Sequence, residues 1–285
     1  MADLNKTVGV IGLGTMGRGI AKLCVANSFD VLVLGRTPES GKLGMSRITS
    51  ELQARLDKGK MTRDEFESTI SRITLIDDPK KLSAARIVIE VISEDMKKKG
   101  DLYRRLEPSL GKDTILASNT SSILIEELSG YLEHPSRFIG LHFFNPAEAM
   151  RLVEVKGSSK TDKATVTAVC EIVTELGKTP IITPDLPGLY VNRILFPMLL
   201  EGISVLECTK SPIEEIDAAM KLGANLPMGP FELCDFIGND IVLNISKVLL
   251  DHTGDLRFKP PKLLEQMVAD GKLGRKSGRG FYEYH

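Results

Sequence analysis

The chain has 285 residues, which is typical of about two domains, and its 42% apolar and 26% charged residues exclude a disordered or collagen-like protein. Thirty-seven Lys and Arg against 38 Asp and Glu leave a net charge of −1 with no polybasic block, so we expect no nucleic-acid partner and no membrane partner. No apolar run approaches about 18 residues, and residues 1–6 show no basic and apolar leader, so we expect a soluble, cytoplasmic protein.

Short apolar runs alternate with amphipathic stretches up to residue 185, a pattern typical of a parallel sheet with crossover helices. Strands are expected at residues 7–11, 31–34, 73–76, 86–92, 114–117, 138–144, 152–156 and 180–183. Between the second and third strands, residues 39–72 predict a helical hairpin whose second helix begins at a capping box of Thr62 and Glu65. The predicted fold class is therefore α/β, a Rossmann-like doubly wound sheet with a helical hairpin insertion.

Beyond Asp185 the strand pattern stops and helical spacing takes over, so residues 186–285 predict a mainly α-helical C-terminal domain after a first domain of residues 1–185. Ser211-Pro212, with Glu214, predicts the start of one of these helices at a capping box. The cysteines lie too far apart for a zinc or disulfide framework, so we expect no metal site and four buried, apolar side chains: Cys24, Cys170, Cys208 and Cys234.

The first expected strand runs directly into a glycine-rich turn and a helix, the context that a dinucleotide-binding motif requires. Gly12 suits the tight turn, Gly14 lets the backbone approach a pyrophosphate, and Gly17 allows close helix packing. The helix N-terminus would then receive the phosphate charge. A purely structural turn is the alternative. The residues predicted to bind the dinucleotide are Gly12, Gly14, Thr15, Met16 and Gly17.

The choice of cofactor should depend on the end of the second strand, where a carboxylate would bind the adenosine ribose of NAD. That strand ends in Gly35-Arg36-Thr37, without an acidic residue. Gly35 leaves room and Arg36 can bind a phosphate through two hydrogen bonds, which favours NADP. An exposed arginine after a strand is often only solvated, so NAD remains open.

One of the four histidines, His142, lies inside an expected strand and is followed by the turn formers Asn145-Pro146. Antiparallel pairing with the next strand about residue 148 would place His142 opposite Glu154 on the same face. A carboxylate beside an imidazole is typical of general base catalysis, whereas a lone strand histidine is often a hydrogen-bonded core residue. Two polar clusters, residues 118–122 and 191–193, are further candidates, with helix capping and turn formation as the alternative.

Taken together, these residues show that the chain resembles the short-chain 3-hydroxyacyl-CoA dehydrogenases, and among them the bacterial-type 3-hydroxybutyryl-CoA dehydrogenases. The resemblance covers nearly the whole length. The segments that carry it are GLGTMG, VIEVISEDMKKKGDLY, ASNTSS, IGLHFFNPAEAMRLVEV, DLPGLYVNR, KLGANLPMGPFELCDFIG and GRKSGRGFYEY.

The resemblance implies a role for each matching residue. His142 would be the base that removes the 3-hydroxyl proton, and Glu154 its partner, while Ser121 and Asn192 would bind and place the substrate. The hairpin would hold coenzyme A, with Lys58 near a basic residue used for that purpose. The residues that would line the cofactor pocket beside the glycine loop are Glu94, Lys99, Asn145 and Lys276.

The implied activity is the interconversion of a short-chain (S)-3-hydroxyacyl-CoA, such as 3-hydroxybutyryl-CoA, and its 3-oxoacyl-CoA by hydride transfer with NAD(P), in a homodimer. The NAD-binding aspartate of the family corresponds to Gly35, so the use of NAD does not carry over directly. Two alternatives stay open. One is a dehydrogenase of 3-hydroxy acids that lack coenzyme A, which would use a lysine base; the other is a catalytically silent nucleotide-binding relative.

Overall fold

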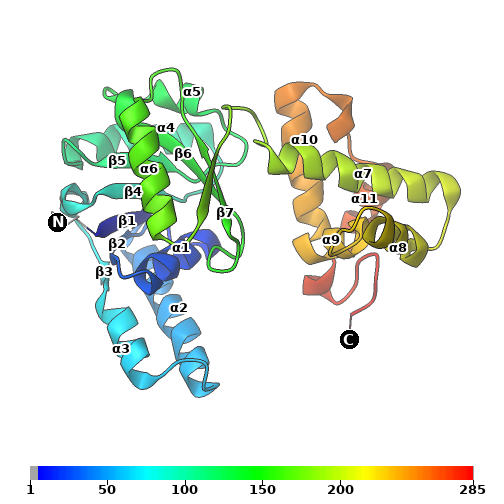
Figure 1. Ribbon diagram of the computed structural model, residues 1–285, viewed down its shortest axis with the longest axis horizontal. Helices are drawn as coiled ribbons and strands as arrows, with labels where there is room; N and C mark the ends of the chain where they lie inside the picture. Colours follow the sequence, from blue (N-terminus) through cyan, green and yellow to red (C-terminus); the bar gives the residue numbers. More distant parts are fainter. Residues whose placement is uncertain (1–5, 285) are drawn as a thin grey trace. The chain divides into compact units, whose positions relative to one another are not determined.

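The computed structural model describes residues 6–284 (Figure 1). Residues 1–5, on which the absence of a leader was judged, and His285 lie outside the described residues. One compact unit ends at Leu186 and a second begins at Pro187; the sequence places the boundary at Asp185. Within residues 6–284, no helix combines the length and the apolar content needed to cross a lipid bilayer. The cytoplasmic location stays a prediction.

The first unit is built on an eight-stranded sheet with the order β3-β2-β1-β4-β5-β6-β7-β8. All neighbours pair in parallel except β6 and β7, which are antiparallel. The Rossmann-like α/β fold and all eight expected strands are confirmed. The strands are β1 Thr7–Ile11, β2 Asp30–Leu34, β3 Ile73–Leu75, β4 Ile87–Glu90, β5 Ile115–Ser118, β6 Phe138–Phe143, β7 Leu152–Lys156 and β8 Thr179–Ile182.

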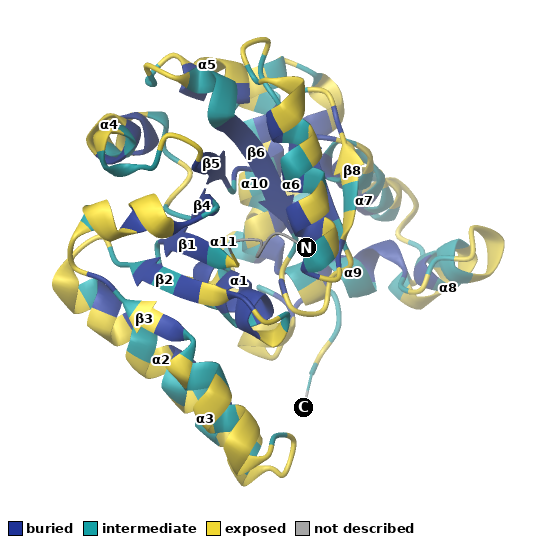
Figure 2. Ribbon diagram, turned by 60° about the vertical axis from the view of Figure 1, so that its left-hand side comes forward, coloured by how far each residue is buried: buried dark blue, intermediate teal, exposed yellow. Residues whose placement is uncertain are grey.

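Helices cover both faces of this sheet because successive strand residues point to opposite sides. Ile89 packs in the core beneath α1 and α6, whereas its neighbour Val88 packs in the core beneath α4 and α5. Figure 2 shows the central strands β4, β5 and β6 in the colour of buried residues. The helices are α1 Thr15–Ala26, α2 Pro38–Asp57, α3 Arg63–Ser71, α4 Met96–Leu106, α5 Ile125–Ser129 and α6 Lys163–Glu175, with 3-10 turns η1 Pro79–Ala84, η2 Glu107–Ser109 and η3 Pro135–Arg137.

The expected hairpin is formed by α2 and α3, which project together from the sheet (Figure 1). The capping box of Thr62 and Glu65 is confirmed, and a second one at the start of α2 joins Thr37 to Ser40. Of the two helices, only α2 carries buried residues, such as Ile48 and Leu52, whereas α3 packs against the core with the partly buried Phe66 and Ile70.

The second unit is helical, as expected, around a core that includes Phe196, Phe231 and Leu249. The predicted capping box at Ser211 and Glu214 is wrong: α8 begins one residue later with Pro212 at its N-cap, so neither side chain is in register to cap it. The helices are α7 Val191–Thr209, α8 Ile213–Gly223, α9 Pro230–Ile237, α10 Asn239–Thr253 and α11 Lys262–Ala269, with 3-10 turns η4 Leu256–Phe258 and η5 Arg275–Ser277.

The expectation of four buried cysteines is only half right. Cys24 and Cys234 are buried, and burial raises the pKa of both thiols, that of Cys24 to about 12. Cys170 is partly exposed and Cys208 is exposed, because each lies on a helix that faces the core with only one side.

Candidate active site

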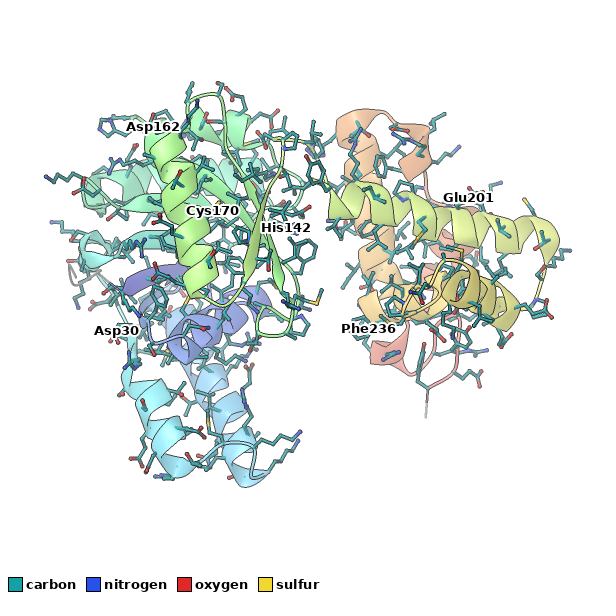
Figure 3. The ribbon with its side chains drawn as sticks, viewed as in Figure 1. Asp30, His142, Asp162, Cys170, Glu201 and Phe236 are labelled. Atoms are coloured by element: carbon teal, nitrogen blue, oxygen red, sulfur yellow. The ribbon has the colours of Figure 1, made fainter. Side chains whose placement is uncertain are left out.

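His142, labelled in Figure 3, lies opposite Glu154 across the antiparallel pair of β6 and β7, in the register that the sequence predicts. The Nδ1 atom of His142 lies 2.8 Å from Oε2 of Glu154. His142 is 7% exposed and Glu154 is fully buried. Because a carboxylate only accepts hydrogen bonds when ionised, the neutral imidazole carries its proton on Nδ1 and leaves Nε2 as a base.

The strand that carries His142 is tied to the loop after β5. The backbone N–H of Phe143 donates to Oδ1 of Asn119 at 3.0 Å. The ring of Phe144 packs on the imidazole with 4.5 Å between centroids. The imidazole is therefore held between Glu154 on β7 and Phe144 just after β6, and the Asn119 bond fixes the strand end that carries it.

The glycine loop fits a dinucleotide phosphate. A Cβ at Gly12, which has a φ of +95°, would lie 2.7 Å from the Val91 carbonyl oxygen, and a Cβ at Gly17 would overlap the Gly12 carbonyl. At Gly14 a Cβ would meet nothing within 4 Å, so this residue faces open space. Gly14 is also the N-cap of α1 and supplies no side-chain cap. The first N–H groups of α1 are therefore suited to an anion.

The residue type at the end of β2 is constrained by the packing of the hairpin helix α2, apart from any contact with a cofactor. A Cβ at Gly35 would overlap the backbone of Gly41 in the first turn of α2. The glycine is thus required by helix packing whichever dinucleotide binds. Arg36 is exposed, and its guanidinium makes no hydrogen bond or ion pair within residues 6–284; the exposed Glu39 follows in α2.

Glu94 and Lys99, both expected beside the cofactor, lie next to each other, and Glu94 contacts the loop that carries Ser121. The N–H of Ser121 donates to Oε1 of Glu94 at 3.0 Å. Lys99 has no exposed surface; its Nζ atom bonds to Glu90 at 2.7 Å and lies 3.7 Å from Glu94. Lys99 therefore has no exposed surface with which it could line a cofactor pocket in this structure.

The remaining predicted residues are spread over both units. Asn145 is exposed two residues after β6, and Lys58 is exposed at the C-cap of α2. Asn192 and Lys276 belong to the second unit, where Asn192 is buried in the first turn of α7. Lys276 is exposed and its Nζ atom bonds to Oδ2 of Asp240 at 2.6 Å.

A row of polar side chains beneath the His142–Glu154 pair was not foreseen. Direct pairing places Glu90, Ser118, Gly140 and Lys156 side by side on one face of β4, β5, β6 and β7. All three polar members are fully buried. An acidic residue ending the otherwise apolar strand run Ile87–Glu90 is the sequence signal that could have revealed this row.

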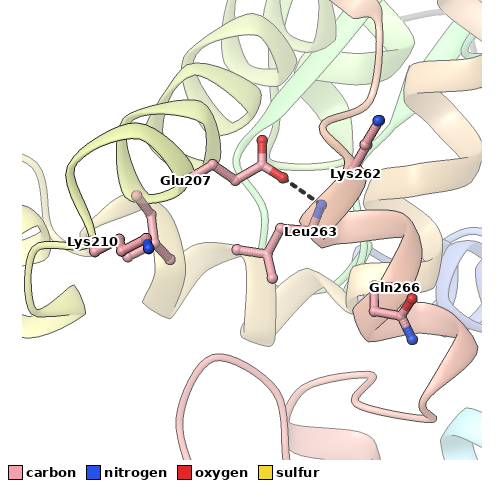
Figure 4. A pocket seen from close by; sticks show the side chains of 6 residues that line it. Glu207, Lys210, Lys262, Leu263 and Gln266 are labelled. Carbon is pink, nitrogen blue, oxygen red and sulfur yellow. Dashed lines mark hydrogen bonds between the residues drawn. The ribbon is translucent and has the colours of Figure 1, made fainter.

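The second unit carries a surface groove of about 660 Å³ (Figure 4). The Glu207 carboxylate accepts the Leu263 N–H at 2.6 Å and so joins α7 to α11 along it. The residues that line the groove are Leu206, Glu207, Lys210, Lys262, Leu263 and Gln266. None of the predicted site residues is among them.

Comparison with known families covers almost the whole chain. Residues 7–186 match the 3-hydroxyacyl-CoA dehydrogenase, NAD binding domain, and residues 188–284 match the 3-hydroxyacyl-CoA dehydrogenase, C-terminal domain. The chain belongs to the 3-hydroxyacyl-CoA dehydrogenase family of oxidoreductases, which confirms the resemblance read from the sequence.

Individual relatives are similar over nearly their full lengths. The 3-hydroxybutyryl-CoA dehydrogenase of Bradyrhizobium diazoefficiens is 42% identical over 284 residues, which is 100% of this chain and 97% of that protein. The mitochondrial hydroxyacyl-coenzyme A dehydrogenase of Sus scrofa is 38% identical, over 99% of this chain and 92% of its own. The crystal structure of (S)-3-hydroxybutyryl-CoA dehydrogenase from Ralstonia eutropha has a TM-score of 0.89 and 40% identity, covering 98% of this chain and 99% of that one.

Proposed function

We propose that this protein interconverts (S)-3-hydroxybutyryl-CoA and acetoacetyl-CoA by hydride transfer with NAD(P), with His142 as the general base. The observation that carries the proposal is the buried hydrogen bond of 2.8 Å between His142 and Glu154 at the carboxyl end of the sheet. The names of the full-length relatives support the acyl-CoA substrate.

The chemistry assigned to the pair is a proton transfer. In oxidation, Nε2 of His142 takes the proton of the 3-hydroxyl group as the hydride leaves the same carbon, and the C–O bond becomes a carbonyl. The bound nicotinamide supplies the hydride acceptor. Glu154 keeps the proton of the neutral ring on Nδ1 and stabilises the imidazolium that forms. In reduction the imidazolium returns its proton to the new alkoxide.

Substrate placement is assigned to polar and basic side chains. Ser121 and Asn192 are proposed to hydrogen-bond the acyl group, and Lys58 on the hairpin is proposed to meet coenzyme A phosphates. For the cofactor we propose the glycine loop with Thr15 and Met16, which are exposed and half-buried at the start of α1. Asn145 and Lys276 are proposed to complete that pocket.

For the cofactor we favour NADPH, because Arg36 is an exposed guanidinium without a protein partner within residues 6–284. Arg36→Leu should raise the KM for NADPH by about tenfold or more, as expected for a lost bidentate phosphate contact, with little change for NADH. Arg63→Leu removes another exposed arginine, which pairs with Glu67, and serves as the control. Better binding of NADH than NADPH by the unaltered protein would overturn the preference.

We also propose a homodimer formed through the second unit. This unit exposes large apolar side chains, including Leu222 at 87%, Leu256 at 75% and Ile194 at 72% of their surface. Exposed apolar groups of this size are typical of surfaces that bind another protein. Light scattering coupled to size exclusion should give twice the chain mass of 31.3 kDa, and a monomer at micromolar concentration would contradict the dimer.

The function is tested by one absorbance assay with two substrates. Acetoacetyl-CoA should support oxidation of NADPH or NADH, whereas free acetoacetate should not. Turnover of the free acid alone would favour a dehydrogenase that does not use coenzyme A. Absence of turnover with both substrates, in a protein that still binds NADPH, would favour a catalytically silent relative.

A further inference from the structure

The loop that carries Ser121 is bound by the side chain of one carboxylate, Glu94. Oε1 of Glu94 accepts the hydroxyl of Thr120 at 2.6 Å, the N–H of Ser121 at 3.0 Å, and both the N–H at 3.0 Å and the hydroxyl at 2.9 Å of Ser122. Successive N–H groups that converge on one point form an anion-binding concavity. Here the protein fills that concavity with its own carboxylate.

The other carboxylate oxygen of Glu94 faces a buried cation. Oε2 lies 3.7 Å from Nζ of Lys99, which also bonds to both oxygens of Glu90 at 2.7 and 2.9 Å. Lys99 and Glu90 have no exposed surface, whereas Glu94 keeps 33% of its side-chain surface. Glu90 is further satisfied by the hydroxyls of Tyr103 at 2.6 Å and Ser118 at 2.8 Å.

The rest of the loop is pinned from other strands, so Glu94 acts within a rigid frame. The Asn119 N–H bonds to the Glu90 carbonyl at 2.8 Å, and the Ile123 carbonyl accepts Nζ of Lys156 at 2.9 Å. Lys156 fills the space left by Gly140, where a Cβ would lie 2.6 Å from its Cγ. Both ends of the loop are therefore fixed, and Glu94 sets the position of residues 120–122 between them.

We propose that Glu94 is a positioning residue that holds Ser121 in place for the substrate through the backbone of residues 120–122, and that buried Lys99 keeps the Glu94 carboxylate oriented and charged. The inference rests on the proposed function only in taking Ser121 as a substrate ligand. It differs from a cofactor-lining role because the Glu94 oxygens are engaged by the loop and by Lys99.

The charge state of Glu94 agrees with this role. Burial works to raise the pKa of Glu94, but the Lys99 ammonium and the hydrogen bonds from Thr120 and Ser122 outweigh it and hold that pKa below its usual value. The carboxylate is therefore ionised throughout the neutral range and makes charge-assisted hydrogen bonds, which are stronger than neutral ones.

The variant Glu94→Gln separates loop positioning from cofactor binding. The neutral amide weakens all four hydrogen bonds, so the amides of residues 119–124 should exchange faster with deuterium. The KM for acetoacetyl-CoA should rise about tenfold, the effect of losing roughly one charge-assisted hydrogen bond. The dissociation constant of NADPH should not change.

Glu107→Gln is the matched control, because Glu107 also accepts two successive N–H groups, from Glu133 at 2.8 Å and His134 at 2.7 Å, at the amino end of β6. It should leave the exchange of residues 119–124 and the KM unchanged. The double variant Glu90→Gln with Lys99→Met removes the buried pair without leaving one charge alone, and it should raise the KM in the same direction as Glu94→Gln.

Unchanged exchange at residues 119–124 in Glu94→Gln, with weaker NADPH binding, would overturn the proposal in favour of a cofactor contact. An unchanged KM in the double variant would overturn the part assigned to Lys99. Absence of acetoacetyl-CoA turnover by the unaltered protein would refute the proposed function, and the exchange measurement would then decide alone whether Glu94 orders the loop.

Discussion

Glu154 places a negative charge beside His142 and also accepts a hydrogen bond from it, because its buried carboxylate lies 2.8 Å from the imidazole. The pair could be predicted because two antiparallel strands joined by a short turn have a register that can be counted from the turn. The bonds of Glu94 to Ser121 could not be predicted in this way. These residues are 27 positions apart, and no repeating pattern relates a side chain to a loop.

Replacement of Glu154 by glutamine should affect rate more than stability. Glu154→Gln keeps the shape but removes the charge that stabilises the imidazolium, so kcat should fall by about 10²- to 10⁴-fold. The free energy of unfolding should fall by no more than about 3 kcal/mol, the value of one hydrogen bond to a charged group. Steady-state rates and urea unfolding check the two effects, and a loss of stability without a loss of rate would contradict the role of Glu154.

At the scale of elements, the glycines at the ends of β1 and β2 differ in purpose. Gly14 faces open space at the N-terminus of α1, whereas Gly35 is covered by the first turn of α2. The glycine motif could be located from the sequence because strand, turn and helix follow within one short segment. The contact between Gly35 and Gly41 could not, since it depends on how closely α2 folds back on the sheet.

Alanine should affect cofactor affinity at Gly14 and stability at Gly35. Gly14→Ala places a methyl group where the dinucleotide phosphates are proposed to lie, so NADPH affinity should fall while stability changes little. Gly35→Ala forces its methyl group against α2 and should lower the free energy of unfolding by about 1–3 kcal/mol. Cofactor titration and urea unfolding measure the two effects. Full NADPH affinity in Gly14→Ala would contradict the phosphate site.

The strands could be predicted from local sequence patterns, but the exact start of one helix could not. The strands follow from runs of apolar and β-branched residues, and seven of them bury part of that run in the core, whereas the edge strand β8 has no buried residue. The start of α8 was misplaced by one residue, because the Ser-Pro-x-Glu pattern matches a capping box whether or not Ser211 is the N-cap. Which residue occupies the N-cap depends on packing of the helix that follows.

At the scale of the whole molecule, the net charge of −1 does not reveal where charged groups are concentrated. The N-terminus of α1 and Arg36 are positive candidate phosphate contacts, whereas several carboxylates are buried. The helical nature of the second unit could be predicted, but the way its C-terminal segment is fixed to the helices could not. Buried Asp235 accepts the N–H groups of Phe281 and Tyr282 at 2.9 and 2.8 Å, and so fixes the last described residues of the chain to α9.

In the same C-terminal segment, the hydroxyl of Tyr282 donates to Asp217 at 2.8 Å. We expect this residue to make a pH-dependent contribution to the free energy of unfolding. Burial and the Asp217 carboxylate raise the pKa of Tyr282 far above its ordinary value. A group whose pKa is raised by folding stabilises fully below its unfolded pKa, here about 10, and loses that contribution as the pH rises further.

Tyr282→Phe should therefore lower the free energy of unfolding by about 1.5–3 kcal/mol at pH 7, as for a hydrogen bond to a charged acceptor. The difference from the unaltered protein should shrink above about pH 10. Urea unfolding followed by circular dichroism at both pH values measures it. An equal difference at both pH values would contradict a pKa of Tyr282 that is raised by folding.

The most direct test of the catalytic assignment compares two histidine variants in the reduction of acetoacetyl-CoA. His142→Gln removes the proposed base, and His252→Gln removes an exposed histidine whose Nδ1 bonds to the Val248 carbonyl in α10. We expect kcat to fall by about 10²- to 10⁴-fold in His142→Gln, with unchanged NADPH affinity, and to stay the same in His252→Gln. Full turnover by His142→Gln would contradict the assignment of His142 as the general base.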